Sequence, residues 1–475
     1  MKHFALVLLF SIMYACSPHS VKVTMEQIDT EEAIGNFTNA TRLIDLFIAE
    51  NDLPPATIYE LNVRKDIMHR IRLDFRKNKE AVAEYIRTYF PDVNDEMLAQ
   101  WENSYVLEYK IIDGEKWYYN RAATNLFRLD NAAKARKEEV DTSSATSTSI
   151  LPVHLPEIIN ILHKSGKTQA PPVKMRVKYA LTLQPNAVPD GETVRCWLPY
   201  PREDHRRQSN IKLLSVNDSN YVISPSQYAH RTIYMEKIVH KDEPLKFAIE
   251  FSYQHAPEWF NLQGKTVQPY DTQSELYKTF TAEHPPHIVF TDSIKAVSER
   301  IIGNETDPYQ KMKKIFQWID AFPWSGAREY STLKNIPQYV LENRRGDCGQ
   351  VTLLFITLAR YNGIPARWES GFTMQPGNLN MHDWSEFYIE GIGWIPMDMS
   401  YGINTFADNE VINCFYTNGI DAYRWIVNSD FSQPLFPNKI FFRSDDVDFQ
   451  RGELEWRGGN IYYNQWKWDF EVVYE

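Results

Sequence analysis

The sequence predicts an α+β fold, in which a central helix packs on an antiparallel sheet, preceded by a β-sandwich-like domain and an N-terminal helical region. Three observations predict this class. Helical patterning dominates residues 26–110, alternating strand patterns occupy about 173–255, and an almost wholly apolar run at 351–359 is followed by two strong strand patterns. The 475 residues, 43% of them hydrophobic, are enough to bury a sizeable core.

The N-terminal stretch MKHFALVLLFSIMYAC is typical of a secretion signal, with a basic start and an apolar run from Phe4 to Met13. Ala15 and Cys16 end it as in a bacterial lipoprotein signal, where the cysteine becomes the acylated first residue. We therefore expect residues 1–16 to be a signal peptide with Cys16 as the lipidation site. The protein would be exported and anchored by lipid in the bacterial cell envelope, facing the periplasm or the cell surface. An ordinary signal peptide with a chance cysteine is the alternative.

Residues 17–150 are expected to form the helical region, because TRLIDLFIAEN and EAVAEYIRTYF carry helical patterning. The polar stretch VDTSSATSTS at 140–149 predicts a surface linker. Residues 151–258 are assigned to the β-sandwich-like domain with a leading linker, since KMRVKYALTLQP, ETVRCWLPYP, RTIYMEKIV and LKFAIEFSYQH alternate as strands. Cys196 lies in one of these strands and is expected to be a buried small hydrophobe.

Residues 259–475 are assigned to one catalytic domain. Helices return in SIKAVSERIIG and DPYQKMKKIFQWIDAF, the latter with Asp307 as its cap and Pro308 at its first position. After the apolar run, HDWSEFYIE and GWIPMDMS predict strands. The alternating stretch GELEWRGGNIYYNQWKWDFEVVYE is expected to add a hairpin at the end of the chain.

Cys348 lies in the stretch RRGDCGQVTLLFITLARYNGIPAR, at the N-terminal end of the apolar helix. Gly363 and Pro365 are expected to end that helix. Unpaired N–H groups and the helix dipole favour a thiolate at this position, and the same N–H groups could stabilise an oxyanion. For a lone cysteine, an inert buried thiol at a helix start is the commoner case.

His382 and Asp398 favour a catalytic role for Cys348 over an inert thiol. The midpoint between them is residue 390, at the head of the turn EGIG, so a hairpin centred there places them on neighbouring strands. Directly opposed Cβ atoms in such a pair lie about 4.5–5.5 Å apart, within reach of a carboxylate–imidazole hydrogen bond. A thiol, a base and an orienting carboxylate form a nucleophile–base–orienter set.

The motifs GDCGQ and GIPAR, followed by HDWSEFYI and GWIPMDMS, resemble the core of the transglutaminase-like superfamily, a branch of the papain-like thiol-enzyme fold. The resemblance covers about residues 285–402. It implies that Cys348 heads the central helix as nucleophile, and that His382 and Asp398 come from adjacent antiparallel strands. The β-sandwich-like domain resembles the accessory domain that precedes this core in bacterial members.

Three aromatic residues are further candidates. Family members often use an upstream aromatic residue to help hold the oxyanion, and Trp324 and Tyr330 are positioned for that role, with plain packing as the alternative. Trp384 falls on the same strand face as His382 and is either a wall of the site or part of the core.

The resemblance implies a cysteine-dependent enzyme that acts on a protein, peptide or cell-wall amide through a thioester, with hydrolysis favoured over amine transfer. The alternative is a non-catalytic peptide- or glycan-binding envelope lipoprotein with the same fold. Nucleic acid is an unsuitable partner, because the net charge is −11 and no basic run occurs. No cofactor or metal is expected: cysteine spacing excludes a CxxC zinc site, and the acidic cluster Asp445, Asp446, Asp448 lacks the spacing and glycine of a calcium loop.

Overall fold

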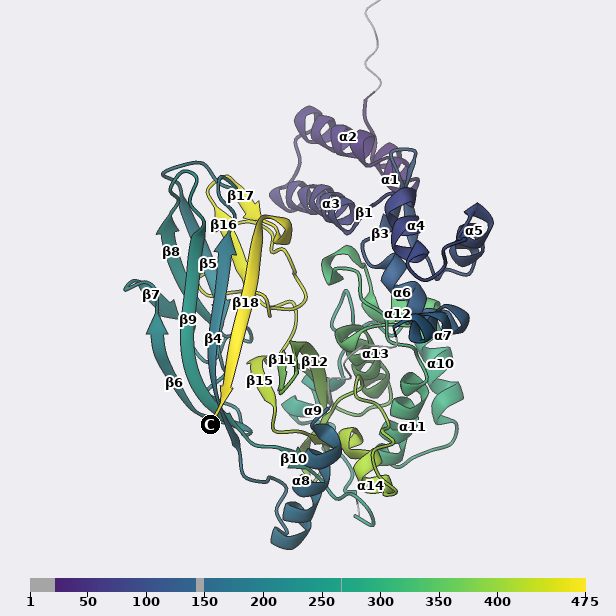
Figure 1. Cartoon of the computed structure of the whole chain (residues 1–475), viewed down its shortest axis with the longest axis vertical. Helices are drawn as coiled ribbons and strands as arrows, with labels where there is room; N and C mark the ends of the chain where they lie inside the picture. The colour runs from purple at the N-terminus through teal and green to yellow at the C-terminus, as the bar shows by residue number, and fades with distance from the viewer. Residues whose placement is uncertain (1–21, 142–148, 266) are drawn as a thin grey trace, which may run out of the picture. The chain divides into compact units, whose positions relative to one another are not determined.

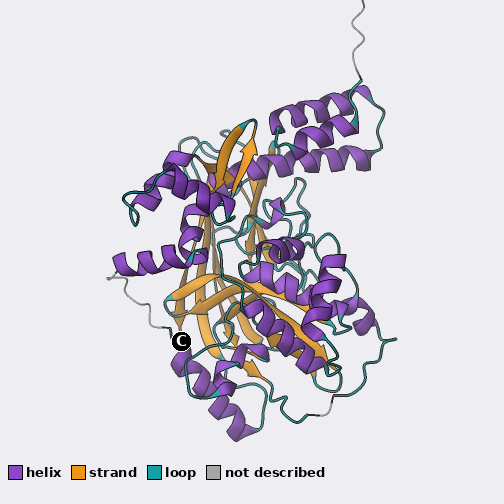
Figure 2. Ribbon diagram, turned by 90° about the vertical axis from the view of Figure 1, so that its right-hand side faces the viewer, coloured by secondary structure: helices purple, strands orange, loops and turns teal. Residues whose placement is uncertain are grey.

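The computed structural model describes residues 22–141, 149–265 and 267–475, so Cys16 and the predicted signal peptide lie outside the described residues. Apart from three short strands among the N-terminal helices, helices and antiparallel sheets occupy largely separate stretches of the chain, which is the predicted α+β class (Figure 2). The chain forms two compact units, one of residues up to 65 with 111–115, the other of 66–110 with 116–475. Every other candidate site residue lies in the second unit.

The first unit is mainly helical. It holds α1 (Met25–Ala33), α2 (Phe37–Glu50) and the first part of α3 (Pro55–Asp74). Thr24 starts α1 with a capping box, in which its hydroxyl accepts the backbone N–H of Gln27 and the Gln27 side chain accepts that of Thr24. Arg64 of α3 forms ion pairs with Asp29 and Glu32 of α1, so the two helices are joined by charge as well as by packing.

Residues 66–140 add helices and three short strands. The helices are α4 (Lys79–Arg87), α5 (Asp95–Asn103), α6 (Ala122–Leu129) and α7 (Asn131–Val140). The strands β1 (Phe75–Lys77), β2 (Tyr109–Ile112) and β3 (Glu115–Tyr119) form one sheet in the order β1-β3-β2. Strands of three to five residues are too short to produce a period-two signal, which is why the sequence predicted helices alone here.

Two antiparallel sheets form a β-sandwich in the middle of the chain. Its first strands are β4 (Val173–Leu183), β5 (Thr193–Pro199), β6 (Gln208–Val216), β7 (Tyr221–Ile223), β8 (Thr232–Ile238) and β9 (Leu245–His255). Side chains from both sheets, among them Val177, Cys196 and Phe251, share one buried core. Cys196 is fully buried, as the sequence predicted.

The C-terminal strands belong to this sandwich, which differs from the assignment of all residues 259–475 to one domain. β16 (Glu453–Trp456) pairs with β5, β17 (Gly459–Ile461) pairs with β16, and β18 (Trp466–Tyr474) runs beside β4 (Figure 1). Alternation predicted these strands and the β16–β17 hairpin. Their pairing with β4 and β5 depends on tertiary packing, which local alternation does not encode.

The leading linker that was predicted to open the segment 151–258 is instead a helix. α8 (Leu151–Ser165) buries Leu155 and Ile159 in a small core with Trp259 and Phe415. Gly166, at φ 67°, ends the helix in the left-handed conformation that glycine adopts at low cost. Much of the predicted linker at 140–149 lies outside the described residues.

The stretch around Cys348 folds as helices packed on a four-stranded antiparallel sheet. The helices are α9 (Glu275–Thr281), α10 (Asp292–Ile302), α11 (Pro308–Asp320), α12 (Ile336–Asn343) and α13 (Cys348–Tyr361). The sheet has the order β13-β12-β11-β15, with β11 (Ala366–Gln375), β12 (Asn378–Ile389), β13 (Gly393–Met397) and β15 (Arg424–Asn428). Asp307 caps α11 and Pro308 is its first residue, as predicted.

α13 is buried along most of its length and packs against β11 and β12, in a core that includes Trp368 and Phe387. β12 and β13 form the predicted hairpin, closed by the pairing of Ile389 with Gly393. The remaining short elements are β10 (Glu258–Trp259), β14 (Gly419–Ile420), α14 (Glu410–Asn413) and the 3-10 turns η1 (Tyr330–Thr332), η2 (Phe415–Thr417) and η3 (Tyr463–Gln465). None of the helices within the described ranges is both long and apolar enough to cross a membrane.

Candidate active site

Cys348 is the first residue of α13, and a capping box fixes where that helix begins. The Asp347 carboxylate accepts the backbone N–H of Gln350 at 3.2 Å, and the Gln350 side chain accepts the N–H of Asp347 at 3.3 Å. Because the two residues satisfy each other's backbone donors, the helix cannot start elsewhere without losing both bonds. Gly363 follows its C-terminus at φ 71°, as predicted.

Tyr330, one of the two upstream aromatic candidates, contacts the same end of α13 and therefore lies beside the thiol. Its hydroxyl accepts the N–H of Gly349 at 3.0 Å and donates to the Asp347 carboxylate at 2.7 Å. A Cβ on Gly349 would lie 2.3 Å from this hydroxyl and 2.6 Å from the Asp383 carboxylate. Only glycine therefore fits after Cys348, and one of the N–H groups expected to hold an oxyanion is bonded to Tyr330.

The hydrogen-bond partner of the thiol is a residue that the sequence did not single out. Cys348 Sγ lies 3.3 Å from Asp383 Oδ2, and the other Asp383 oxygen accepts an N–H of Gln450 at 2.7 Å. Burial, followed by the charges of Asp383 and Asp347, raises the pKa of Cys348 well above its usual value. The helix N-terminus was expected to favour a thiolate, but desolvation and two carboxylates outweigh it, so the thiol is neutral in this arrangement.

His382 and Asp398 are brought together as predicted. His382 Nε2 lies 2.7 Å from Asp398 Oδ2, and both side chains are buried. Burial opposes ionisation of Asp398, but the neighbouring His382 and Arg424 outweigh it and hold the pKa of Asp398 below its usual value. The backbone N–H of Ser400 donates to the other Asp398 oxygen at 3.1 Å, so both oxygens are fixed. An ionised Asp398 favours the tautomer with its proton on Nε2, which leaves Nδ1 as the acceptor.

The structure divides the predicted three-residue set between the two faces of the sheet. His382 and Asp383 are consecutive in β12, and consecutive side chains in a strand point to opposite faces. Asp383 pairs across to Ser370, on the face that meets α13 and the thiol, whereas His382 pairs across to Gly371 on the other face. The prediction paired residues 382 and 398 correctly but could not determine which face α13 covers.

A cavity of about 150 Å³ opens beside the thiol. Cys348, Trp324 and Tyr330 all line it, so both upstream aromatic candidates are near the nucleophile. The Trp324 ring is 42% exposed and has the Arg128 guanidinium 4.3 Å from its centroid, so it forms an outer wall. Charged side chains form much of the remaining lining: Arg121, Arg328, Glu329, Asp347, Asp383, Asp445, Asp448, Arg451 and Glu453.

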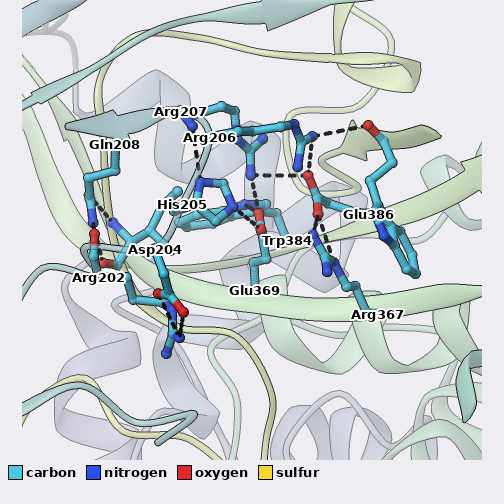
Figure 3. Close-up of polar contacts among 12 residues, drawn as sticks. Arg202, Asp204, His205, Arg206, Arg207, Gln208, Arg367, Glu369, Trp384 and Glu386 are labelled. Atoms are coloured by element: carbon cyan, nitrogen blue, oxygen red, sulfur yellow. Dashed lines mark hydrogen bonds and ion pairs between the residues drawn. The ribbon is translucent and has the colours of Figure 1, made fainter. Parts of the chain in front are cut away.

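Trp384 does not line this cavity. Its indole N–H donates to Glu369 at 2.7 Å, and its ring stacks with that of His382 at a centroid distance of 5.9 Å. Glu369 also contacts His205 at 2.6 Å and pairs with the buried Arg207 (Figure 3). Trp384 therefore supports the imidazole from behind and connects it to the loop that precedes β6.

His205, Glu369 and Glu386 are the described residues most suited to hold a metal ion, since their ligand atoms lie within 4.8 Å of one another. Their carboxylates are already engaged by arginines, as Figure 3 shows. The arginines are Arg206, Arg207 and Arg367. A cation entering this cluster would have to displace guanidinium groups and would meet their repulsion, so the cluster is suited to joining the sandwich to β11 and β12.

Comparison with known proteins shows which family this core matches. A model of the transglutaminase-like superfamily matches residues 295–399. An uncharacterized protein of Haemophilus influenzae is 26% identical over 242 residues, which cover 44% of this chain and 63% of that protein. The uncharacterized protein YebA of Bacillus subtilis is 22% identical over 187 residues, 32% of this chain and 25% of YebA. The chain thus spans less than two thirds of the length of either relative.

Two solved structures share a more distant likeness. A Cytophaga hutchinsonii protein provisionally described as a cysteine protease has 14% identity and a TM-score of 0.41, covering 65% of this chain and 91% of that one. A Parabacteroides distasonis protein provisionally described as a protease has 10% identity and a TM-score of 0.20, covering 54% and 65%. The family match, by contrast, spans both α13 and the β12–β13 hairpin. Residues 295–399 of this chain are a core of the transglutaminase-like superfamily.

Proposed function

We propose that this chain is a cysteine-dependent enzyme that cleaves amide or peptide bonds through a thioester at Cys348. The observation that carries the proposal is the buried 2.7 Å contact between His382 and Asp398, because it fixes an imidazole with Nδ1 as its proton acceptor within a transglutaminase-like core. Cys348 at the start of a buried helix, beside a cavity, supplies a nucleophile where substrate can enter.

In the proposed reaction, the Cys348 sulfur attacks a carboxamide carbon as the thiol proton passes to His382 Nδ1. The imidazolium then donates this proton to the leaving amine, and the acyl group remains on sulfur as a thioester. Water, deprotonated by the neutral His382, attacks the thioester and restores the thiol. We propose hydrolysis over amine transfer, because water competes wherever the site does not exclude it. The substrate would be a protein, peptide or cell-wall amide.

Because His382 and Asp383 point to opposite faces of β12, the reaction requires β12 to rearrange when substrate binds, so that His382 takes the place of Asp383 beside the thiol. Replacing Asp383 with asparagine is expected to increase the rate at which iodoacetamide alkylates Cys348 at neutral pH, roughly tenfold, because the carboxyl group that accepts the thiol proton is replaced by an amide whose N–H₂ can donate to the sulfur. The asparagine oxygen can still accept the Gln450 N–H. Peptide mass spectrometry measures the rate, with Asp446→Asn as a control that removes an exposed carboxylate. Equal rates in both variants would mean that Asp383 does not keep the thiol neutral.

A non-catalytic peptide- or glycan-binding protein is the second candidate. The contact between Cys348 and Asp383 favours it, because a neutral thiol bonded to a carboxyl group is a weak nucleophile. Incubation of the protein with peptide and cell-wall amides, with and without an added amine, separates the candidates. Mass spectrometry is expected to find free acid products that require Cys348. Binding without any bond cleavage across these substrates would favour the second candidate.

We also propose that the protein is exported and held in the cell envelope by a lipid on Cys16, as the lipoprotein-like signal suggests. Cys16→Ala is expected to move the protein from the membrane pellet to the soluble fraction, because the proposed acyl chains on Cys16 would be lost with the sulfur. Fractionation after a salt wash, followed by immunoblotting, measures this. A variant that stays in the washed pellet would contradict anchoring through Cys16.

A further inference from the structure

Arg424, the first residue of β15, lies behind the His382–Asp398 pair and is fully buried. Its Nη1 forms an ion pair with Asp398 Oδ2 at 2.8 Å. Its Nε and Nη2 donate to Asp421 Oδ2 at 3.0 and 2.6 Å. The side chains of His382, Asp398, Arg424 and Asp421 thus form one continuous buried series. Residues 421 and 424 lie outside the segment that matches the superfamily, so that match does not assign them a role.

Aromatic side chains hold the guanidinium in place. The Tyr401 and Tyr416 rings lie 4.8 and 5.8 Å from its carbon, and the Trp384 ring lies at 5.3 Å. The Tyr416 hydroxyl donates to Asp421 Oδ2 at 3.0 Å, so the far carboxylate is fixed as well. A buried arginine with this many partners has little freedom to move.

The net charge of this series of side chains depends on whether His382 is protonated. With a neutral imidazole, two carboxylates face one guanidinium, which leaves one net negative charge in a buried site. When the imidazole accepts a proton, these four side chains together carry no net charge. Without Asp421, Arg424 would cancel the charge of Asp398, and the protonated imidazole would instead create a buried net positive charge.

We propose that Arg424 and Asp421 are positioning residues for the reaction: Arg424 fixes the Asp398 carboxylate, and Asp421 neutralises Arg424 so that the charge of Asp398 acts on His382. This inference rests on the proposed thiol-enzyme function. Neither residue would touch substrate, so each would act through Asp398 on the imidazole.

The test uses the full-length chain with Asp421→Asn, which preserves shape and removes the far charge. We expect kcat to fall roughly 10- to 100-fold with KM within about twofold, because the loss appears only once the imidazole is protonated. Arg424→Lys keeps the charge and is expected to retain more activity than Arg424→Gln. The matched control is Glu455→Gln, which removes a buried carboxylate paired with Arg195 in the sandwich and is expected to leave kcat unchanged.

A second measurement does not depend on activity. The Nε2–H proton of His382, observed by NMR in protein with ¹⁵N-labelled histidine and assigned with His382→Gln, is expected to move upfield in Asp421→Asn, because Asp398 becomes a weaker acceptor. If Asp421→Asn does not fold, Tyr416→Phe removes only the hydroxyl bond to Asp421. Asp421 then directs more of its charge at Arg424, so the proton should move the opposite way, downfield, by less. An unchanged resonance in a folded variant would overturn the positioning role, whether or not the protein is an enzyme. Lack of activity in the unaltered chain, with the expected shift present, would overturn the proposed function alone.

Discussion

Cys348→Ala is expected to abolish amide turnover while leaving the melting temperature nearly unchanged, because the sulfur is needed as a nucleophile and contributes little packing. Cys348→Ser should also be severely impaired, since a hydroxyl ionises far less readily than a thiol. Turnover of a peptide amide, with circular dichroism melts of each variant, measures both effects. Cys414→Ala is the matched control, because Cys414 is also partly exposed but borders a different cavity. Full turnover by the alanine variant would contradict nucleophilic catalysis by Cys348.

Asp398→Asn is expected to lower kcat roughly 10- to 1000-fold, or about 1.4 to 4 kcal/mol of transition-state stabilisation, with a smaller effect on KM. The substitution keeps the shape but removes the charge that favours the imidazolium. The asparagine N–H₂ can also face Nε2 and favour the wrong tautomer. Because Arg424 would lose an ion partner as well, a melting curve must accompany the kinetics.

The competing view is that Asp398 only stabilises the buried pair of strands. On that view, Asp398→Asn would lower the melting temperature but leave kcat and the neutral-pH alkylation rate of Cys348 unchanged. Steady-state kinetics and alkylation of the same folded sample separate the two views. Unaltered values of both would exclude Asp398 from the catalytic set.

The helix and hairpin that carry the site could be predicted because their signals are local. Asp347 and Gln350 form a capping box three residues apart, and the turn after Ile389 determines the register of β12 and β13. The contact between His382 and Asp398 follows from that register. The contact between Cys348 and Asp383 does not, because it depends on which face of β12 meets α13, and a sequence pattern leaves the choice between the faces open.

Residues distant in sequence could not be assigned for the same reason. Gln450 and Asp448 reach Asp383 from a loop more than sixty positions along the chain, where the sequence offered only an acidic cluster without calcium-loop spacing. No local pattern marks Arg424, which the fold buries between Asp398 and Asp421. The strands β16 and β18 were similarly visible as strands, but their partners in the sandwich depend on tertiary packing.

Acid-quenched mass spectrometry of the protein tests whether a thioester forms on Cys348 during turnover. The protein is mixed with a peptide or cell-wall amide that it turns over, quenched within the first turnovers, and digested to locate any added mass. An acyl adduct is expected on the peptide containing Cys348, and hydroxylamine should remove it, whereas Cys348→Ala should never form it. Substrate cleavage that continues in Cys348→Ala, with no adduct on the unaltered protein, would contradict a thioester on Cys348.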